Sequence, residues 1–246
     1  MRIFDGERQL DIPIWITVTD SSLTTALQTV SVNDRPGLAA AGSPIYQART
    51  FSCTGTLFAD TPSEVEKIRS RLAAALTGKT LTVYRDDSDD ISYRCVLMGD
   101  IRVSYYSGID ISRAFTISFT LKALDPFGYG PAQTVTAPHG AHTVTVFAEG
   151  NCPVIPRITI QPLTHLEGVL LECSGSYLEL NKRLSLTAGE SLIFENGYLY
   201  HNGQDISIRL AKRAVISPII FQAGNNTVIS HIPQAAVTFD FQGRYT

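Results

Sequence analysis

The feature that most constrains the fold is a stretch of strictly alternating residues between Phe115 and Leu121. Apolar side chains occupy every second position, and the positions between them hold threonine or serine. This period of two is typical of an antiparallel strand that has one buried face and one solvated face. Weaker versions of the pattern predict further strands over residues 14–18, 51–58, 81–84 and 93–98.

One segment predicts a helix, and it begins at Thr61. Thr61 can accept hydrogen bonds from backbone N–H groups, Pro62 suits the first helical position, and Glu64 completes a capping box. Apolar residues then recur at three- and four-residue steps up to Gly78, which ends the pattern. We therefore expect a single α-helix near residues 62–77 in a chain that otherwise consists of strands.

The second half of the chain is predicted to form a β-sandwich. Turn residues separate its short apolar stretches about every 8 to 12 residues, which is typical of that architecture. Asn196-Gly197 and Asn202-Gly203 predict two-residue hairpins, because a type I′ turn needs positive φ at both central residues. We expect three short strands around these two turns. Further strands are expected over residues 143–147, 157–160, 169–172, 177–180 and 237–241.

A stretch rich in proline and glycine, from Asp125 to Pro131, separates the two halves. Proline removes a donor from a β-ladder, and both residue types favour turns. The chain has 246 residues, whereas an average domain has about 150. We therefore expect a mainly β protein of two domains: an N-terminal β-sandwich or barrel-like domain with one helix over residues 1–133, and an antiparallel β-sandwich over residues 134–246.

Charge and composition exclude several classes of protein. The chain has 20 basic and 23 acidic residues, which give a net charge of −3 and no basic surface of the kind that specific nucleic-acid binding requires. No uncharged apolar stretch is long enough for membrane insertion. Charged residues between Met1 and Arg8 leave no apolar core for a signal peptide, so we expect synthesis to end in the cytosol.

The cysteines are spaced far apart and form no Cys-x-x-Cys pair. This spacing argues against both a zinc ribbon and a disulfide scaffold. We therefore expect four buried free thiols, at Cys53, Cys95, Cys152 and Cys173.

The sequence contains no pattern typical of a catalytic, cofactor or metal site. No Gly-x-Ser-x-Gly motif is present, and the segment Gly128–Gln133 lacks the third glycine of a dinucleotide loop. The aspartates of residues 86–90 lack the glycine and glutamate of an EF-hand and predict a solvated turn. His139 and His142 have no neighbouring carboxylate or thiol to complete a zinc site. We therefore expect no enzyme, no catalytic residue, no cofactor and no bound metal.

Aromatic residues of the second half leave two interpretations open. Sugar-binding sandwiches commonly stack a pyranose on an exposed ring, and Tyr198 and Tyr200 are the residues that we expect to contact such a ligand. Tyr177 and His201 are further candidates. Tyrosine at hairpin positions is also ordinary sheet packing, which is the simpler interpretation.

The order of several motifs resembles a known family. The first half contains Phe4-Asp5-Gly6, a glycine-containing loop from Arg35 to Gly42, the segment Tyr46–Arg49 before a strand, the capped helix, and an exit from Phe119 to Gly130. The second half contains Gly150-Asn151, Ala188-Gly189-Glu190, Tyr200-His201-Asn202-Gly203, Ala223-Gly224-Asn225-Asn226, and a closing strand from Phe239 to Tyr245. In this order and spacing the chain resembles, over nearly its full length, the distal tail proteins of long-tailed (siphovirus-type) bacteriophages, which are components of the tail tip.

The resemblance implies a structural protein of the virion. In the family, N-terminal domains form a hexameric ring that connects the tail tube to the tip, and galectin-like C-terminal β-sandwiches point outward as attachment platforms. The implied partners are further copies of the chain, the tail tube protein, a tail-tip hub or fibre protein and a receptor-binding protein, with assembly in the cytoplasm of the host bacterium. Some members carry carbohydrate-binding insertions, but this chain is too short for a large one. The alternative is a carbohydrate-binding module that contacts the host surface through its C-terminal sandwich.

A ring that closes through head-to-tail contacts needs a surface that reaches the neighbouring copy. The segment from Asn33 to Arg49 is a candidate, because Leu38, Ile45 and Tyr46 stand there among glycine, proline and alanine. It is either an arm that contacts the next copy or a surface loop, and the loop is the simpler interpretation.

Overall fold

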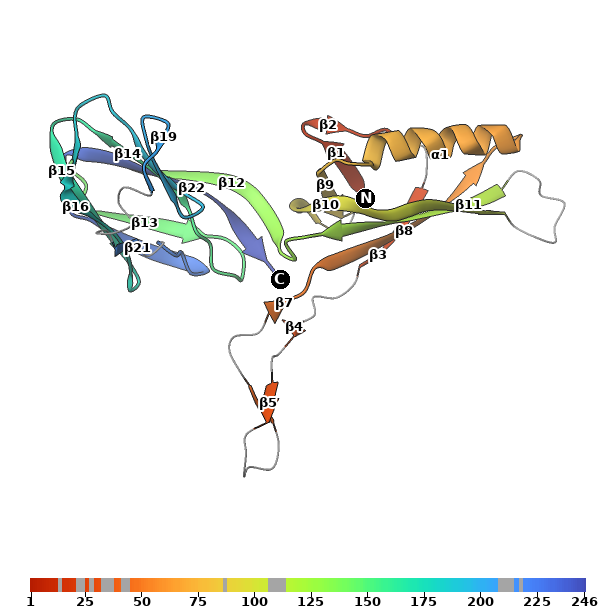
Figure 1. Ribbon diagram of the computed structural model, residues 1–246, viewed down its shortest axis with the longest axis horizontal. Helices are drawn as coiled ribbons and strands as arrows, with labels where there is room; N and C mark the ends of the chain where they lie inside the picture. The colour runs from red at the N-terminus through yellow and green to blue at the C-terminus, as the bar shows by residue number, and fades with distance from the viewer. Residues whose placement is uncertain are drawn as a thin grey trace. The chain divides into compact units, whose positions relative to one another are not determined.

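The computed structural model describes residues 1–12, 15–20, 25–26, 29–31, 38–40, 45–85, 88–105, 114–207, 215–216 and 219–246. The fold is mainly β with one α-helix, so the predicted fold class is confirmed (Figure 1). The chain divides into two compact units: unit 1 comprises Met1–Gly128 with Thr246, and unit 2 comprises Tyr129–Tyr245. The proline- and glycine-rich stretch follows the end of a strand, as expected, but its second half already belongs to the next strand, β12 (Gly128–Ala137).

Unit 1 is built on an antiparallel sheet with the strand order β2-β1-β9-β10-β11-β8-β3. The strands are β1 (Arg2–Asp5), β2 (Arg8–Gln9), β3 (Trp15–Asp20), β8 (Arg49–Phe58), β9 (Leu81–Arg85), β10 (Ser88–Tyr105) and β11 (Ala114–Ala123). The alternating residues of β11 lie opposite those of β8, with Phe119 beside Cys53 and Leu121 beside Phe51. These four side chains are buried, so the predicted solvated and buried faces are both present.

Helix α1 (Pro62–Leu76) lies along one face of this sheet (Figure 1). Its buried residues are Val65, Leu72 and Leu76, and they belong to the same apolar core as the inward side chains of the strands. The predicted start is confirmed, because the Thr61 hydroxyl accepts a hydrogen bond from the Glu64 N–H at 3.3 Å. The Glu64 carboxylate reaches one residue further back than a capping box requires and accepts from the Asp60 N–H at 2.8 Å.

Four short strands between β3 and β8 form two antiparallel ladders. They are β4 (Thr25–Ala26), β5 (Thr29–Ser31), β6 (Leu38–Ala40) and β7 (Ile45–Tyr46). Strand β5 pairs with β6, and β4 pairs with β7. In the sequence the β5–β6 ladder is therefore nested inside the β4–β7 ladder, and we call these four strands the arm.

Unit 2 contains two antiparallel sheets. The first has the order β19-β18-β17-β14-β22-β12, and the second has the order β13-β21-β15-β16-β20. Their strands after β12 are β13 (Thr143–Ala148), β14 (Arg157–Pro162), β15 (Leu166–Cys173), β16 (Ser176–Leu186), β17 (Leu192–Glu195), β18 (Tyr198–His201), β19 (Gln204–Asp205), β20 (Val215–Ile216), β21 (Gly224–Ser230) and β22 (Ala235–Tyr245).

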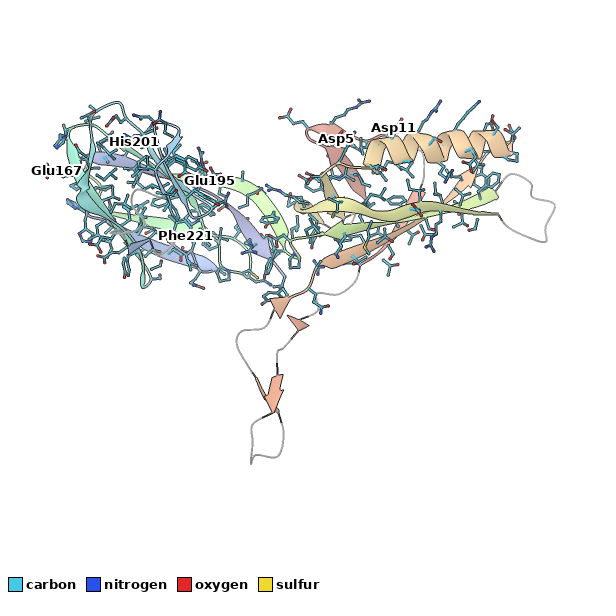
Figure 2. All side chains as sticks on the ribbon, in the orientation of Figure 1. Asp5, Asp11, Glu167, Glu195, His201 and Phe221 are labelled. Carbon is cyan, nitrogen blue, oxygen red and sulfur yellow. The ribbon has the colours of Figure 1, made fainter. Side chains whose placement is uncertain are left out.

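Figure 1 shows the two sheets of unit 2 packed face to face. Their inward side chains form one continuous core, which makes unit 2 a β-sandwich. Phe221 is fully buried in that core, with its ring 5.6 Å from that of Phe239 and 5.3 Å from that of Phe241 (Figure 2). Such aromatic contacts contribute about 0.5–1.5 kcal/mol each beyond the burial of area.

The three-stranded meander predicted from the Asn-Gly pairs is also confirmed. Asn196 and Gly197 have φ values of 51° and 83°, and Asn202 and Gly203 have values of 48° and 80°. Strands β17, β18 and β19 pair across these two turns.

Candidate functional site

The two tyrosines predicted to contact sugar lie on the same strand and the same face. In β18, Leu199 is fully buried, so Tyr198 and Tyr200 on either side of it point away from the core. Tyr198 is 52% exposed and lies opposite Glu195, whose carboxylate is 3.4 Å from the Arg157 guanidinium. The structure thus places Tyr198 and Tyr200 side by side on the outer face of the first sheet. The Arg157–Glu195 ion pair lies next to them on that face.

Tyr177 does not belong to that group. It lies on β16, in the second sheet of unit 2, and points outward from that sheet with 38% of its surface exposed. Because the outward faces of the two sheets of a sandwich are separated by the core, Tyr177 cannot share a ligand with Tyr198. His201, the other candidate, has its Nε2 atom 3.3 Å from the Glu190 carboxylate.

Tyr177 is one of the residues that line a surface pocket of about 470 Å³. Its lining comes from strands β15, β16 and β21 and from the turn between β15 and β16: Leu170, Glu172, Cys173, Ser174, Gly175, Ser176, Tyr177, Glu179, Thr227 and Ile229. Volumes of this size are typical of small-molecule sites, and the mixture of apolar surface with a few polar groups is typical as well.

Two motifs of the family resemblance meet in the structure. The Glu190 carboxylate accepts hydrogen bonds from the Thr187 N–H at 2.6 Å and from the Asn202 side chain at 3.3 Å, and Asn202 in turn accepts one from the Ser191 N–H. The pKa of Glu190 is lowered, mainly by the bond from the Thr187 backbone and further by His201 and Asn202. These side chains hold the turn before β17 against the turn after β18.

Another motif residue, Asn226, is almost completely buried. Its side chain accepts a hydrogen bond from the Gln222 N–H and donates to the carbonyl groups of Gln222 and Gly224. Asn226 therefore closes the loop before β21, because its buried side chain is hydrogen-bonded to three backbone groups of that loop.

Sequence reasoning did not identify the charged cluster in unit 1. Arg49 is buried, with its Nε atom 3.3 Å from the Asp20 carboxylate and its Nη1 atom donating to the Tyr93 hydroxyl at 2.7 Å. Arg85 contacts the other oxygen of Asp20 at 2.7 Å. Since burial of a charge is costly without partners, this cluster has a structural role in joining β3, β8, β9 and β10.

The three interface candidates belong to the arm. Leu38 begins β6, Ile45 begins β7, and Tyr46 ends β7. The Tyr46 ring packs edge-on against Phe127 with 5.0 Å between the ring centres, and 41% of the residue is exposed. The side chains of Leu38 and Ile45 lie outside the described part of the structure, and contacts with another copy remain a prediction.

Within the described part of the chain, no three His, Cys, Asp or Glu side chains approach closely enough to hold a metal ion. Of the aspartate-rich turn, Asp86 and Asp87 lie outside the described residues. No helix among the described residues has the length and apolar character that crossing a membrane requires.

All four cysteines are free and buried, as predicted. Burial raises the pKa of Cys53 and that of Cys95 to about 12, from an ordinary value of 9.0. Because the thiolate is the reactive form, we expect the native chain to react with an aromatic disulfide reagent at pH 8 about a thousandfold more slowly at these two thiols than the urea-unfolded chain does. Mass spectrometry of the labelled peptides measures both rates.

The same shifts predict a dependence of stability on pH. A thiol with a higher pKa in the folded chain keeps its proton there while the unfolded chain loses it, so the free energy of unfolding decreases as the pH rises from about 9 towards 12. Fast labelling of Cys53 and Cys95 in the native chain would contradict both expectations.

Comparison with known proteins yields a likeness of structure. No protein-family model and no curated protein matches the sequence. The chain is similar to the Dit protein of phage SPP1, which is described as a paradigm of the hub adsorption apparatus in phages that infect Gram-positive bacteria; the TM-score is 0.77, the identity is 14%, and the match covers 100% of this chain and 99% of that one.

Two structures of the phage P2 baseplate in its activated conformation, with Ca and with Sr, also match. They do so with 10% identity, over 97% of this chain and 96% of theirs, and with TM-scores of 0.43 and 0.41. The predicted resemblance to distal tail proteins is confirmed at the level of the fold: the chain has the fold of the SPP1 Dit protein.

Proposed function

We propose that this chain is a structural protein of a bacteriophage tail tip. The observation that carries the proposal is the match to SPP1 Dit, a hub protein, which extends over the full length of both chains. A match of both units, in their order along the sequence, is more informative than a match of a single sandwich, because β-sandwiches serve many unrelated functions.

The contacts of the motif residues support a structural role. Glu190, Asn202 and Asn226 are engaged with backbone groups of neighbouring turns, and Arg49 is engaged with an ion pair between strands. Side chains that are used in this way stabilise a shape. Shape complementarity with neighbouring subunits is what a scaffold protein requires.

We propose further that the chain forms a hexameric ring that connects the tail tube to the tip. A ring of identical copies that closes by rotation requires a head-to-tail interface. Each copy then contacts its two neighbours through two different surfaces. The arm is suited to one of them, because its strands carry apolar residues at Leu38, Ile45 and Tyr46. Unit 2, as the galectin-like domain, serves as the attachment platform for hub, fibre or receptor-binding proteins, and the assembled ring resides in the virion.

The purified chain is expected to form rings. Light scattering measures the mass of the particles, and negative-stain electron microscopy shows their shape. Leu38→Asp combined with Ile45→Asp is expected to yield monomers with unchanged circular dichroism, because two buried charges in an interface oppose association. Leu163→Asp, which places a charge at an exposed apolar residue of unit 2, is the control and is expected to retain the ring.

Wild-type chain that stays monomeric at all concentrations, and that is absent from purified phage particles, would refute the proposed function. Rings that persist in the double variant would leave the structural role intact but would exclude the arm from the interface.

A further inference from the structure

We propose that the pocket around Tyr177 in unit 2 binds a neutral saccharide ring. The proposal goes beyond a structural role in the tail tip and does not depend on ring formation. Of the aromatic residues that the sequence offered, it uses Tyr177, and it leaves out Tyr198 and Tyr200, which lie on the other sheet of the sandwich.

The strand register places the central groups of the pocket in a row. Glu172 on β15 lies opposite Ile229 on β21 and opposite Tyr177 on β16. Directly opposed side chains in an antiparallel pair have Cβ atoms about 4.5–5.5 Å apart. The carboxylate of Glu172 is therefore flanked on one side by an aromatic ring and on the other by an aliphatic side chain.

A second row lies two residues further along the strands. Leu170 on β15 is opposite Glu179 on β16. Two residues of a strand span about 6.6–6.8 Å, so the two rows together form a patch with an acid and an apolar group in each row. Thr227 and Ser174 add hydroxyl groups to the lining.

This combination matches the chemistry of a sugar ring. A pyranose has an apolar face of C–H groups, which can pack on the Tyr177 ring, and a rim of hydroxyl groups. Carboxylates accept hydrogen bonds from neighbouring hydroxyls through two oxygens each, and serine and threonine both donate and accept. Apolar surface with a few polar groups that fix orientation is the usual composition of a small-molecule site.

The contacts of Glu172 favour a neutral ligand over a cation. The Nε2 atom of His231 is 3.1 Å from one oxygen of Glu172. The backbone of His231 is held by a hydrogen bond from its N–H to the Leu170 carbonyl at 3.1 Å. Histidine is thus already the partner of that oxygen, in the place that an ammonium group of a cationic ligand would take.

The wall of the pocket is fixed before a ligand binds. Ser174 and Gly175 form a two-residue turn with φ values of 46° and 83°. The Ser176 hydroxyl donates to the Cys173 carbonyl at 2.6 Å and accepts from the Ile220 N–H at 3.1 Å. Affinity is gained when the groups that bind are already ordered, because little conformational entropy is then lost.

The test uses the full chain and saturation-transfer difference NMR with methyl glycosides of glucose, galactose, mannose, rhamnose, N-acetylglucosamine and N-acetylgalactosamine. We expect at least one glycoside to receive saturation, most strongly at its ring C–H protons. Tyr177→Ala is expected to weaken this binding about tenfold, the value of one aromatic contact. Glu179→Gln is expected to weaken it as well, because the amide has one acceptor oxygen where the carboxylate has two.

Tyr198→Ala is the matched control, because it removes an exposed tyrosine from the other sheet, and it is expected to leave binding unchanged. If none of the six glycosides receives saturation from the protein, the proposal is overturned. Glycoside binding that depends on Tyr198 and not on Tyr177 would overturn it too. Binding of the cationic peptide trilysine instead of the glycosides would also overturn it, because the site would then prefer a cation to a neutral ligand. If Tyr177→Ala lowers the melting temperature, Glu179→Gln decides, because Glu179 is exposed and its replacement preserves the shape of the side chain.

Discussion

Asp20→Ala is expected to destabilise unit 1 by about 3–5 kcal/mol, the usual cost of removing one member of a buried ion pair. The Asp20 side chain is 16% exposed and lies between two guanidinium groups, Arg49 at 3.3 Å and Arg85 at 2.7 Å. Without the carboxylate these two positive charges face each other, and Arg49, whose side chain is only 8% exposed, retains the Tyr93 hydroxyl as a neutral acceptor. The remaining charge is then buried without a counter-charge.

Urea unfolding followed by tryptophan fluorescence measures this effect in unit 1 alone. Trp15 is the only tryptophan of the chain and belongs to β3. Glu66→Ala is the control: it breaks an ion pair with Arg69 on the surface of α1, where both side chains are about half exposed, and is expected to cost less than about 0.5 kcal/mol. Equal losses in the two variants would contradict a structural role for the buried cluster.

Gly150→Ala is expected to destabilise unit 2 by about 2–5 kcal/mol, through positive-φ strain and overpacking together. Gly150 has a φ of 100°, and a Cβ atom added there would lie 2.1 Å from the Arg244 carbonyl oxygen. That oxygen accepts hydrogen bonds from the N–H groups of Asn151 and Cys152 at 2.9 and 3.2 Å. The clash is with backbone, so relief requires the segment to separate from β22 and lose both bonds.

Gly189→Ala is the matched control for this second prediction. Gly189 has a φ of 87°, but an added Cβ would meet nothing within 4 Å, so only the backbone strain of about 1–2 kcal/mol applies. Urea unfolding followed by near-ultraviolet circular dichroism gives the two free energies. Hydrogen exchange should show faster opening of residues 149–152 and 239–245 in Gly150→Ala alone, and equal stability of the two variants would exclude the clash.

Local chemistry accounts for the elements that were predicted from the sequence. The cap at Thr61 and the two Asn-Gly turns each depend on residues that are adjacent along the chain, and all three have the expected conformation. The length of strand β10 was underestimated: the strand was expected over residues 93–98, but it runs over Ser88–Tyr105. Its register shifts between Met98 and Arg102, and Gly99 has a φ of 71°, so a bulge interrupts the alternation that marks a strand.

The pocket and the charged cluster could not be predicted because they depend on pairing between distant strands. Alternation indicates that Tyr177 and Ile229 point away from the core, but the pairing of β15 with both β16 and β21 is what places them on either side of Glu172. In the same way Asp20 and Arg49 meet because β3 pairs with β8. An arginine at the start of a strand resembles any solvated charge until its neighbours are known.

The free thiols have a consequence for the conditions under which the chain can fold. Since the four cysteines take part in no disulfide, folding requires no oxidation step, and the free energy of unfolding does not depend on the thiol–disulfide potential of the surroundings. A chain of this kind is expected to reach the same fold under reducing and under oxidising conditions.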